Sequence, residues 1–260
     1  MIPLLPVDAI IARLSEEHAR QGVGVLAADA DGTLWDGDVG IDFFEALLAA
    51  DGVREAARER LAADAGELGI TVKGRQPTSL AIALYAAYAS DRYPHDRASA
   101  MMAWAFAGWH HDEVRAFAEE ILDEGRIEAR IRPEMRRIFA WAEGNGVPIY
   151  VVSASPIAIV VASVARLGVT VRGALGMTPA IDERGVLLPR LYGPIVNGDG
   201  KLRALEAAGV KEPILGAFGD SWHDAAMLRA AKVRVAVAPA PHLREIAPGI
   251  TGLIELERDR

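Results

Sequence analysis

Two carboxylates stand two residues apart in the segment Asp29-Ala30-Asp31-Gly32-Thr33, directly after an apolar run from Val23 to Ala28. Such a run is typical of a buried strand, and residues i and i+2 of a strand point to the same face. Two like charges held that close raise each other's pKa unless a cation lies between them. The pair therefore indicates a divalent-metal site, or a nucleophilic carboxylate beside a second one that transfers a proton.

Other polar groups follow expected strands further along the chain. Ser153 comes directly after an expected strand over Val147–Val152, and the segment Gly219-Asp220-Ser221-Trp222-His223-Asp224 follows one over Ile214–Phe218. Lys201 begins an expected helix over residues 201–208. Ligands of open parallel sheets bind at the carboxyl ends of the strands, so we expect all these groups at one edge of the sheet.

This set of groups suits phosphoryl transfer. Mg²⁺ is a hard ion that prefers carboxylate and carbonyl oxygens, and a nucleophilic carboxylate can form an acyl phosphate. A serine hydroxyl and a lysine ammonium can hold the phosphate oxygens. Charge compensation and positioning then supply most of the catalysis.

The rest of the sequence predicts the elements that must position these groups. After Pro133 the pattern alternates between helices and strands, which favours an α/β fold with a doubly wound, mainly parallel sheet. The further helices expected there cover residues 134–143, 157–167, 225–231 and 242–247, and the further strands cover 169–175 and 233–237. Ala180–Ile181 and Val186–Leu188 are expected to form a hairpin. A helix over Val7–Arg20 precedes the first strand, and another over Asp42–Leu48 follows the acidic motif.

An all-helical block interrupts this core. From about residue 54 to 125 the chain is rich in Ala, Arg and Glu, and its periodicity predicts helices over 54–68, 77–90, 94–107 and 112–123. A strand over Ile70–Val72 is the one doubtful exception. We therefore expect a catalytic core of residues 1–48 and 132–260, with an inserted helical cap of residues 49–131.

Composition narrows the class of protein. The 260 residues are 51% hydrophobic, contain no cysteine and carry a formal charge of −8. The charge disfavours nucleic acid or an anionic membrane as the main partner, but a bound metal could still attract a phosphorylated substrate. No apolar run could span a bilayer, and no secretory signal is evident. We expect a cytoplasmic protein, with a homodimer left open.

On these residues the chain resembles the haloacid dehalogenase superfamily. The segment Asp29–Thr33, then Ser153, Lys201 and the segment Gly219–Asp224 match its four motifs in order. The helical insert is similar to the superfamily's type-1 cap. Three further segments resemble the phosphoserine-phosphatase-like branch, namely Gly108–Val114, Arg132-Pro133 and Ser153-Ala154-Ser155-Pro156.

The resemblance implies a Rossmannoid core and a role for each motif. Asp29 would attack phosphorus and become an aspartyl phosphate, while Asp31 would protonate the leaving oxygen and then activate water. Ser153 and Lys201 would hold the phosphoryl group. The implied ligands of Mg²⁺ are Asp29, the backbone carbonyl of Asp31, Asp220, and Asp224 directly or through water.

Contacts to the leaving group are less defined by sequence. The candidates are Thr33, Trp35, Asp38, Arg75, Ala154, Trp222 and His223. Asp38 matches a position where the branch often has a Glu beside the substrate's amino group, so it favours a cationic or hydroxyl-bearing leaving group. Trp35 and Trp222 are expected to pack, although a pocket shared with Asp38 would favour a quaternary ammonium.

Departures from the branch disfavour phosphoserine itself. Trp222 and His223 replace small residues and an Asn, and Ala154-Ser155 replaces two glycines. Ser155 is expected to cap the helix that follows it. His110-His111 could suggest a second metal site, but a structural role is favoured.

The sequence thus predicts a Mg²⁺-dependent phosphatase that hydrolyses a small phosphorylated metabolite through an aspartyl phosphate. One alternative is a phosphotransferase or phosphomutase that uses the same intermediate. Another is a non-catalytic domain that binds phosphorylated ligands. The presence of both Asp29 and Asp31 argues against the last, because a binding module needs neither nucleophile nor acid.

Overall fold

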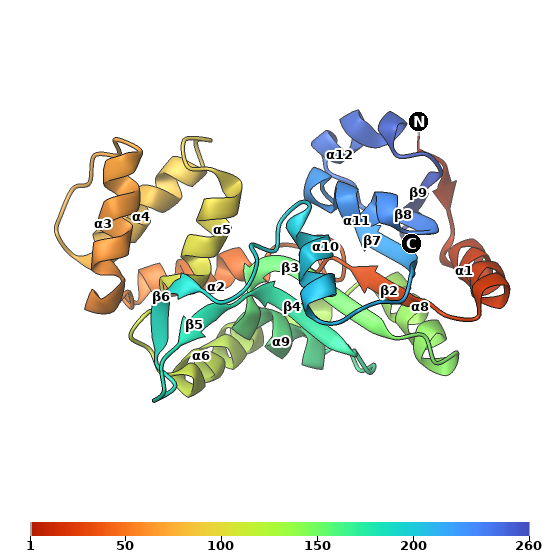
Figure 1. Cartoon of the computed structure of the whole chain (residues 1–260), viewed down its shortest axis with the longest axis horizontal. Helices are drawn as coiled ribbons and strands as arrows, with labels where there is room; N and C mark the ends of the chain where they lie inside the picture. Colours follow the sequence, from red (N-terminus) through yellow and green to blue (C-terminus); the bar gives the residue numbers. More distant parts are fainter. Residues whose placement is uncertain (1, 260) are drawn as a thin grey trace.

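A seven-stranded parallel sheet forms the centre of the computed structural model, which describes residues 2–259 (Figure 1). Every neighbouring pair in this sheet is parallel. In spatial order the strands are β1 (Leu4–Leu5), β9 (Leu253–Leu256), β8 (Val233–Val237), β7 (Ile214–Gly219), β2 (Val25–Ala28), β3 (Ile149–Pro156) and β4 (Gly173–Met177). The expected doubly wound α/β fold is confirmed.

The central strand β2 is buried on both faces because its alternate residues enter two different hydrophobic clusters. Leu26 and Ala28 belong to the same cluster as Ile10 and Leu14 of helix α1 (Val7–Gln21). Val25 and Ala27 lie in the other cluster. That second cluster includes residues of α10 (Gly200–Ala207), α11 (Ala225–Ala230) and α12 (Pro241–Ile246). The period of two along the strand thus places helices on both faces of the sheet.

Two further helices complete the first face. They are α8 (Pro133–Gly144), which contacts α1 and β3, and α9 (Ile157–Ala165), which contacts β3 and β4. Pro133 occupies the first turn of α8, where the missing N–H costs nothing. The helix α2 (Val39–Ala49) packs against α9.

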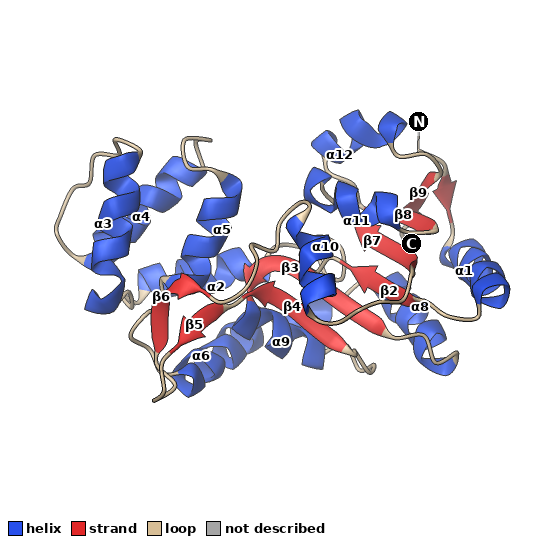
Figure 2. Ribbon diagram, viewed as in Figure 1, coloured by secondary structure: helices blue, strands red, loops and turns tan. Residues whose placement is uncertain are grey.

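Helices α3 (Arg58–Glu67), α4 (Pro77–Tyr88) and α5 (His95–Trp104) form a group beside the sheet (Figure 2). A short 3-10 turn, η1 (Glu55–Ala57), precedes α3. Helix α5 joins the group to the core, because it contacts β3 and the hairpin of β5 (Pro179–Ile181) and β6 (Leu187–Leu191). Helix α6 (His111–Glu124) packs on α9 and α2 instead, and α7 (Ile127–Arg130) leads back toward α8. The division of the chain into a catalytic core and a cap of residues 49–131 stays a prediction.

Several predicted boundaries are wrong. The strand predicted over 169–175 begins at Gly173, and the helix predicted from residue 54 is divided into η1 and α3. The segment Ile70–Val72 is not a strand. The predicted helix at 242–247 does not end the fold, because β9 follows it. Strands β1 and β9 were missed, since each is too short to show an alternating pattern and is stabilised by pairing at the sheet edge.

Candidate active site

Strand register brings three of the predicted motifs together. Ala28 of β2 pairs with Val151 of β3 on one side and with Phe218 of β7 on the other. Asp29 and Asp220 follow the last residues of β2 and β7, and the register places Ser153 at the same edge. Ser153 lies within β3, which continues to Pro156, so the prediction that the strand ends at Val152 is wrong. The three side chains meet at a cavity of about 400 Å³. Its lining includes Asp29, Asp31, Asp38, Tyr88, Ser99, Met102, Ser153, Ala154, Ser155, Asn197, Lys201, Asp220, Ser221 and His223.

A buried ammonium joins two of the carboxylates. Nζ of Lys201 lies 2.5 Å from an oxygen of Asp29 and 2.5 Å from an oxygen of Asp224, and all three side chains are buried. Burial raises the pKa of Asp29 well above its usual value; Lys201 partly offsets this, while Asp224 and Asp220 add to it. Burial lowers the pKa of Lys201, but its two carboxylate partners more than compensate, and the ammonium form is retained.

The carboxylates near Lys201 fit a divalent cation. Asp29, Asp220 and Asp224 each offer an oxygen, and these atoms lie within 4.8 Å of one another. Burial, and then Asp224, raise the pKa of Asp220 to about 7. Three carboxylates thus face one ammonium, an excess of negative charge that a hard cation would relieve. The donor set is all oxygen, as Mg²⁺ requires.

Gly32 is needed for this close approach. Its φ is +72°, in the left-handed region, and a Cβ atom there would lie 2.4 Å from Oδ2 of Asp220. A larger residue at position 32 would therefore push Asp220 away from Asp29.

Both carboxylate oxygens of Asp224 accept hydrogen bonds from other groups of the protein. Oδ1 accepts the hydrogen bond from Lys201, and Oδ2 accepts from the backbone N–H groups of Asp220 and Ser221 and from the Ser221 hydroxyl. Its carboxylate therefore orients Lys201 and the loop that carries Asp220.

The Asp31 carboxylate is fixed from both sides. Oδ1 accepts hydrogen bonds from Nε1 of Trp35 (2.9 Å) and the backbone N–H of Val39 (2.7 Å). Oδ2 accepts from the hydroxyls of Ser155 (2.7 Å) and Ser153 (3.4 Å). Four donors hold one rotamer at the cavity wall, the arrangement expected of a group that must move a proton at a defined position.

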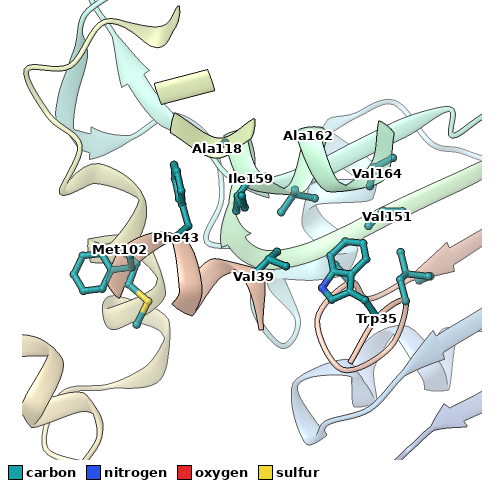
Figure 3. Close-up of a cluster of buried hydrophobic side chains, with 14 of the residues drawn as sticks. Trp35, Val39, Phe43, Met102, Ala118, Val151, Ile159, Ala162 and Val164 are labelled. Atoms are coloured by element: carbon teal, nitrogen blue, oxygen red, sulfur yellow. The ribbon is translucent and has the colours of Figure 1, made fainter. Parts of the chain in front are cut away.

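Of these donors, Ser155 differs from expectation, whereas Trp35 packs as expected. Ser155 does not cap helix α9, whose N-cap is Pro156 without a side-chain hydrogen bond, so that prediction is wrong. Trp35 is fully buried in the core near Val39 and Val151 (Figure 3) and is not among the residues lining the cavity. The structure places Trp35 behind Asp31, which it orients through the indole N–H.

Asp38 lines the cavity and also begins helix α2. Its Oδ1 accepts a hydrogen bond from the backbone N–H of Ile41 (2.8 Å), a normal N-cap contact. Burial, and then the neighbouring charge of Asp31, raise the pKa of Asp38 to about 8. Tyr88 of α4 lies at the same cavity, and its pKa is raised by burial and by the charge of Asp38.

His223 lines the cavity, whereas Trp222 is not among the lining residues and is 47% exposed. The two rings lie 3.9 Å apart between centroids, and His223 also lies 5.5 Å from the ring of His95 on α5. Burial lowers the pKa of His223 to about 4, so the ring is neutral near pH 7. The His95 contact connects the helical group with the loop of Asp220.

The remaining candidates divide between the cavity and other places. Ala154 lines the cavity. Thr33 is buried behind it, with its hydroxyl 3.5 Å from Oδ2 of Asp29. Arg75 lies in the exposed loop between α3 and α4, outside the cavity lining, where its carbonyl accepts a hydrogen bond from Arg58. The predicted site residues therefore line the cavity, with the exception of Trp35, Trp222, Thr33 and Arg75. Asp224 is also absent from the lining and lies behind Lys201, with which it pairs.

Sequence reasoning missed several residues of the cavity. These are Tyr88, Ser99, Ser155, Asn197 and Ser221. Ser155 and Ser221 lie within recognised motifs, so their hydroxyls could have been considered. Ser99 of α5 gave no signal, because only the packing of α5 on β3 brings it to the site. Tyr88 gave none either, since it ends α4, which packs on α5.

A second group of potential ligands, His110, His111 and Asp112, lies at the start of α6. His110 accepts from the backbone N–H of Asp112, and Glu113 accepts from the backbone N–H of His110. These contacts form a capping arrangement and support the structural role favoured from sequence. None of the described helices has both the length and the apolar character needed to cross a bilayer.

Comparisons with known proteins agree with this geometry. The profile of the haloacid dehalogenase-like hydrolase family matches residues 26–229. Phosphoserine phosphatase SerB1 of Mycobacterium tuberculosis (strain ATCC 25618 / H37Rv) is 32% identical over 139 residues, which cover 52% of this chain and 44% of that protein. The match thus spans less than half the length of this relative.

Solved structures share the fold. A Bordetella pertussis Tohama I protein superposes with a TM-score of 0.69 at 19% identity, covering 90% of this chain and 98% of that one. A protein of Anaerococcus prevotii DSM 20548 gives a TM-score of 0.66 at 16% identity, covering 95% and 90%. At these identities the similarity establishes the architecture alone.

Proposed function

Because the chain belongs to the haloacid dehalogenase-like hydrolase family, we propose that it is a Mg²⁺-dependent phosphatase of small phosphomonoesters. The proposal includes an aspartyl-phosphate intermediate on Asp29. One observation carries it: Asp29, Asp220 and Asp224 converge within 4.8 Å, with the oriented carboxylate of Asp31 at the same cavity. The name of the SerB1 relative supports a phosphomonoester as substrate.

In the first step an Asp29 oxygen attacks phosphorus and forms a new P–O bond. The bond between phosphorus and the ester oxygen breaks, and Asp31 in its protonated form gives that oxygen a proton, so the alcohol leaves neutral. The hydrogen bonds from Trp35, Val39 and Ser155 hold Asp31 in place for this transfer. Lys201 donates a hydrogen bond to the other oxygen of Asp29, which keeps this carboxylate from rotating.

In the second step Asp31, now ionised, accepts a proton from water as the water oxygen attacks phosphorus. The P–O bond to Asp29 breaks, inorganic phosphate leaves, and both carboxylates return to their starting state. Ser153 and Lys201 would hold the phosphoryl oxygens. Mg²⁺, when bound by Asp29, Asp220, the Asp31 carbonyl and Asp224 through water, would neutralise the charge that develops on phosphorus.

The proposal also includes a cytoplasmic location and a protein that binds neither nucleic acid nor a membrane. The formal charge of −8 supports the last two points, because it repels both kinds of anionic partner. A homodimer stays open.

Hydrolysis in ¹⁸O-water tests the proposal and separates it from phosphotransfer. With Mg²⁺ and p-nitrophenyl phosphate, we expect one ¹⁸O atom in each released phosphate after a single turnover, because water attacks the acyl phosphate at phosphorus. Unlabelled phosphate that appears only on an added alcohol would favour the phosphotransferase. Activity that survives EDTA would contradict the metal site.

A further inference from the structure

The loop that follows β2 pairs with the segment that precedes α8. The backbone N–H of Asp36 donates to the carbonyl of Arg130 (3.0 Å), and the backbone N–H of Arg132 donates to the carbonyl of Leu34 (2.9 Å). These two hydrogen bonds form a short antiparallel contact. The contact places the side chain of Arg132 against the turn at Gly32.

The guanidinium of Arg132 is shared between two acceptors of this loop. Nη2 lies 2.7 Å from Oδ1 of Asp36. Nη2 and Nε also donate to the backbone carbonyl of Gly32, at 3.1 Å and 3.3 Å. Arg132 is only 7% exposed, and a buried guanidinium is costly unless its charge is paired and its N–H groups are hydrogen-bonded. Asp36 supplies the opposite charge, and the Gly32 carbonyl accepts further N–H groups, which fixes the direction of that carbonyl.

The peptide group before Gly32 is fixed as well. The backbone N–H of Gly32 donates to the carbonyl of Gly37 (3.0 Å). In a planar trans peptide the N–H and C=O groups point in opposite directions, and the described residues contain no cis peptide bond. The carbonyl of Asp31 therefore points away from Gly37. Within residues 2–259 no hydrogen-bond donor reaches this carbonyl, so it can act as a metal ligand.

Gly32 links this carbonyl to a second expected ligand of the ion. Its φ of +72° lies in the left-handed region, and a Cβ atom there would lie 2.4 Å from Oδ2 of Asp220. A rotation of the Gly32 backbone would thus turn the Asp31 carbonyl and also change the close approach to Asp220. The hydrogen bonds from Arg132 to the Gly32 carbonyl oppose such a rotation.

We propose that Arg132 is a positioning residue of the metal site, which acts through Gly32 to hold the Asp31 carbonyl in the orientation that a Mg²⁺ ligand needs. The inference rests on the Mg²⁺ site of the proposed function and adds a residue that does not itself bind the ion. Mg²⁺ demands nearly ideal octahedral geometry, so a carbonyl that can rotate is a poor ligand. Residues that orient metal ligands typically contribute about 10–100-fold to metal affinity.

The charge of Arg132 and its positioning role predict opposite effects when the guanidinium is removed. A guanidinium repels Mg²⁺, so the loss of its charge alone would strengthen metal binding. Loss of the hydrogen bonds to Gly32 would weaken metal binding. A purely structural role would lower the Tm of the metal-free protein and leave the Kd for Mg²⁺ unchanged. The direction of the change in Kd therefore separates the three roles.

Isothermal titration calorimetry with Mg²⁺ measures this Kd in the wild-type protein and in Arg132→Met, which keeps an unbranched apolar stem and has no N–H donor. We expect Kd to rise by about tenfold or more in the variant. The matched control is Arg258→Gln. Arg258 lies 2.7 Å from the other carboxylate oxygen of Asp36 but is exposed, so its loss should leave Kd unchanged. A Kd in Arg132→Met equal to or below the wild-type value would overturn the inference.

Arg132→Lys is the second variant, for the case in which Arg132→Met does not fold. Lysine keeps the positive charge but not the planar fork of donors. We expect its Kd for Mg²⁺ to rise, by less than in Arg132→Met, and an unchanged Kd in the folded lysine variant would also contradict the positioning role.

Turnover of p-nitrophenyl phosphate gives an independent readout. The Mg²⁺ concentration for half-maximal activity should rise in both variants, while kcat at saturating Mg²⁺ should approach the wild-type value, because the reacting side chains are unchanged. A kcat that stays low at saturating Mg²⁺, with an unchanged Kd, would assign Arg132 to another role.

The two proposals fail differently. If Mg²⁺ neither gives a heat of binding with the wild-type protein nor raises its Tm, the metal site is refuted, and this inference with it. If the wild-type protein binds Mg²⁺ and the Arg132 variants bind it equally well, the metal site stands and the positioning role of Arg132 is wrong.

Discussion

Two ion clusters in this molecule are built around buried carboxylates but differ in charge balance. In the helical group beside the sheet, Asp64 accepts hydrogen bonds from Tyr93 and Arg97, and Nε of Arg60 lies 3.3 Å from it. One buried carboxylate there has two cations and a hydroxyl, and the exposed Glu67 pairs with one of these cations, so the charges balance. At the sheet edge three carboxylates lie together, and the single ammonium among them, that of Lys201, pairs with two of them, Asp29 and Asp224.

This difference separates a structural cluster from a functional one. The charge of Asp64 is fully compensated by its protein partners, so this cluster needs no ligand. Its contacts hold α3 to the start of α5. The cluster at the sheet edge is stable only to the extent that a further cation compensates its excess charge. Burial of charge alone is therefore a poor sign of function; the uncompensated charge is the informative quantity.

The largest effect is expected from Asp29→Asn. Turnover should fall by about 10⁴-fold or more, the scale seen when a nucleophile is removed, while Lys201 keeps Asp224 as a partner. The unfolding free energy without metal should not decrease, because repulsion from Asp220 and Asp224 is also removed. Steady-state kinetics and chemical denaturation measure the two quantities. Wild-type turnover in this variant would refute the nucleophile.

Added Mg²⁺ should stabilise the protein through the unbalanced cluster. At a concentration 100 times Kd, a ligand that binds only the folded state adds about 2.7 kcal/mol, visible as a rise in Tm. Asp220→Asn should lose this rise, whereas Asp64→Asn, at the balanced cluster, should keep it. An equal rise in wild type and Asp220→Asn would place the metal elsewhere.

The balanced cluster should show the reverse behaviour. Asp64→Asn is expected to lower the unfolding free energy by about 2 kcal/mol, because hydrogen bonds to a buried charge are lost, with turnover retained. Glu67→Gln is the control: Glu67 pairs with the same Arg97 but is exposed, so its loss should lower the unfolding free energy by clearly less than the loss of Asp64. A large loss of turnover in folded Asp64→Asn would mean that the two clusters are coupled.

The smallest effect concerns pH. Burial, and then Asp64, raise the pKa of Tyr93 above its usual value of 10.0. A raised pKa in the folded state contributes stability that is present below pH 10 and is lost as pH rises further. Wild type should therefore exceed Tyr93→Phe by about 1 kcal/mol at pH 8. This advantage should shrink above pH 10 by up to about 1.4 kcal/mol per pH unit. Denaturation curves of both proteins from pH 8 to 11 test this, and parallel curves would contradict it.

The sequence by itself determined the sheet and the order of the chemical groups. Apolar runs such as Val23–Ala28 are long enough to show strand character, and an acidic or hydroxyl residue directly after such a run must lie at the carboxyl edge of a parallel sheet. The edge strand β1 and its neighbour β9 were not predicted, because two to four residues carry too little pattern and the two strands pair with each other across almost the whole sequence.

The tertiary structure alone decided which partner each carboxylate received. Lys201 reaches Asp29 across 172 positions, and Ser155 reaches Asp31 across 124. Packing likewise brought Tyr88 to the cavity beside Asp38. Local sequence fixes residue type and backbone periodicity, but hydrogen bonds and charge balance depend on distances between segments, which exist only once the chain has packed.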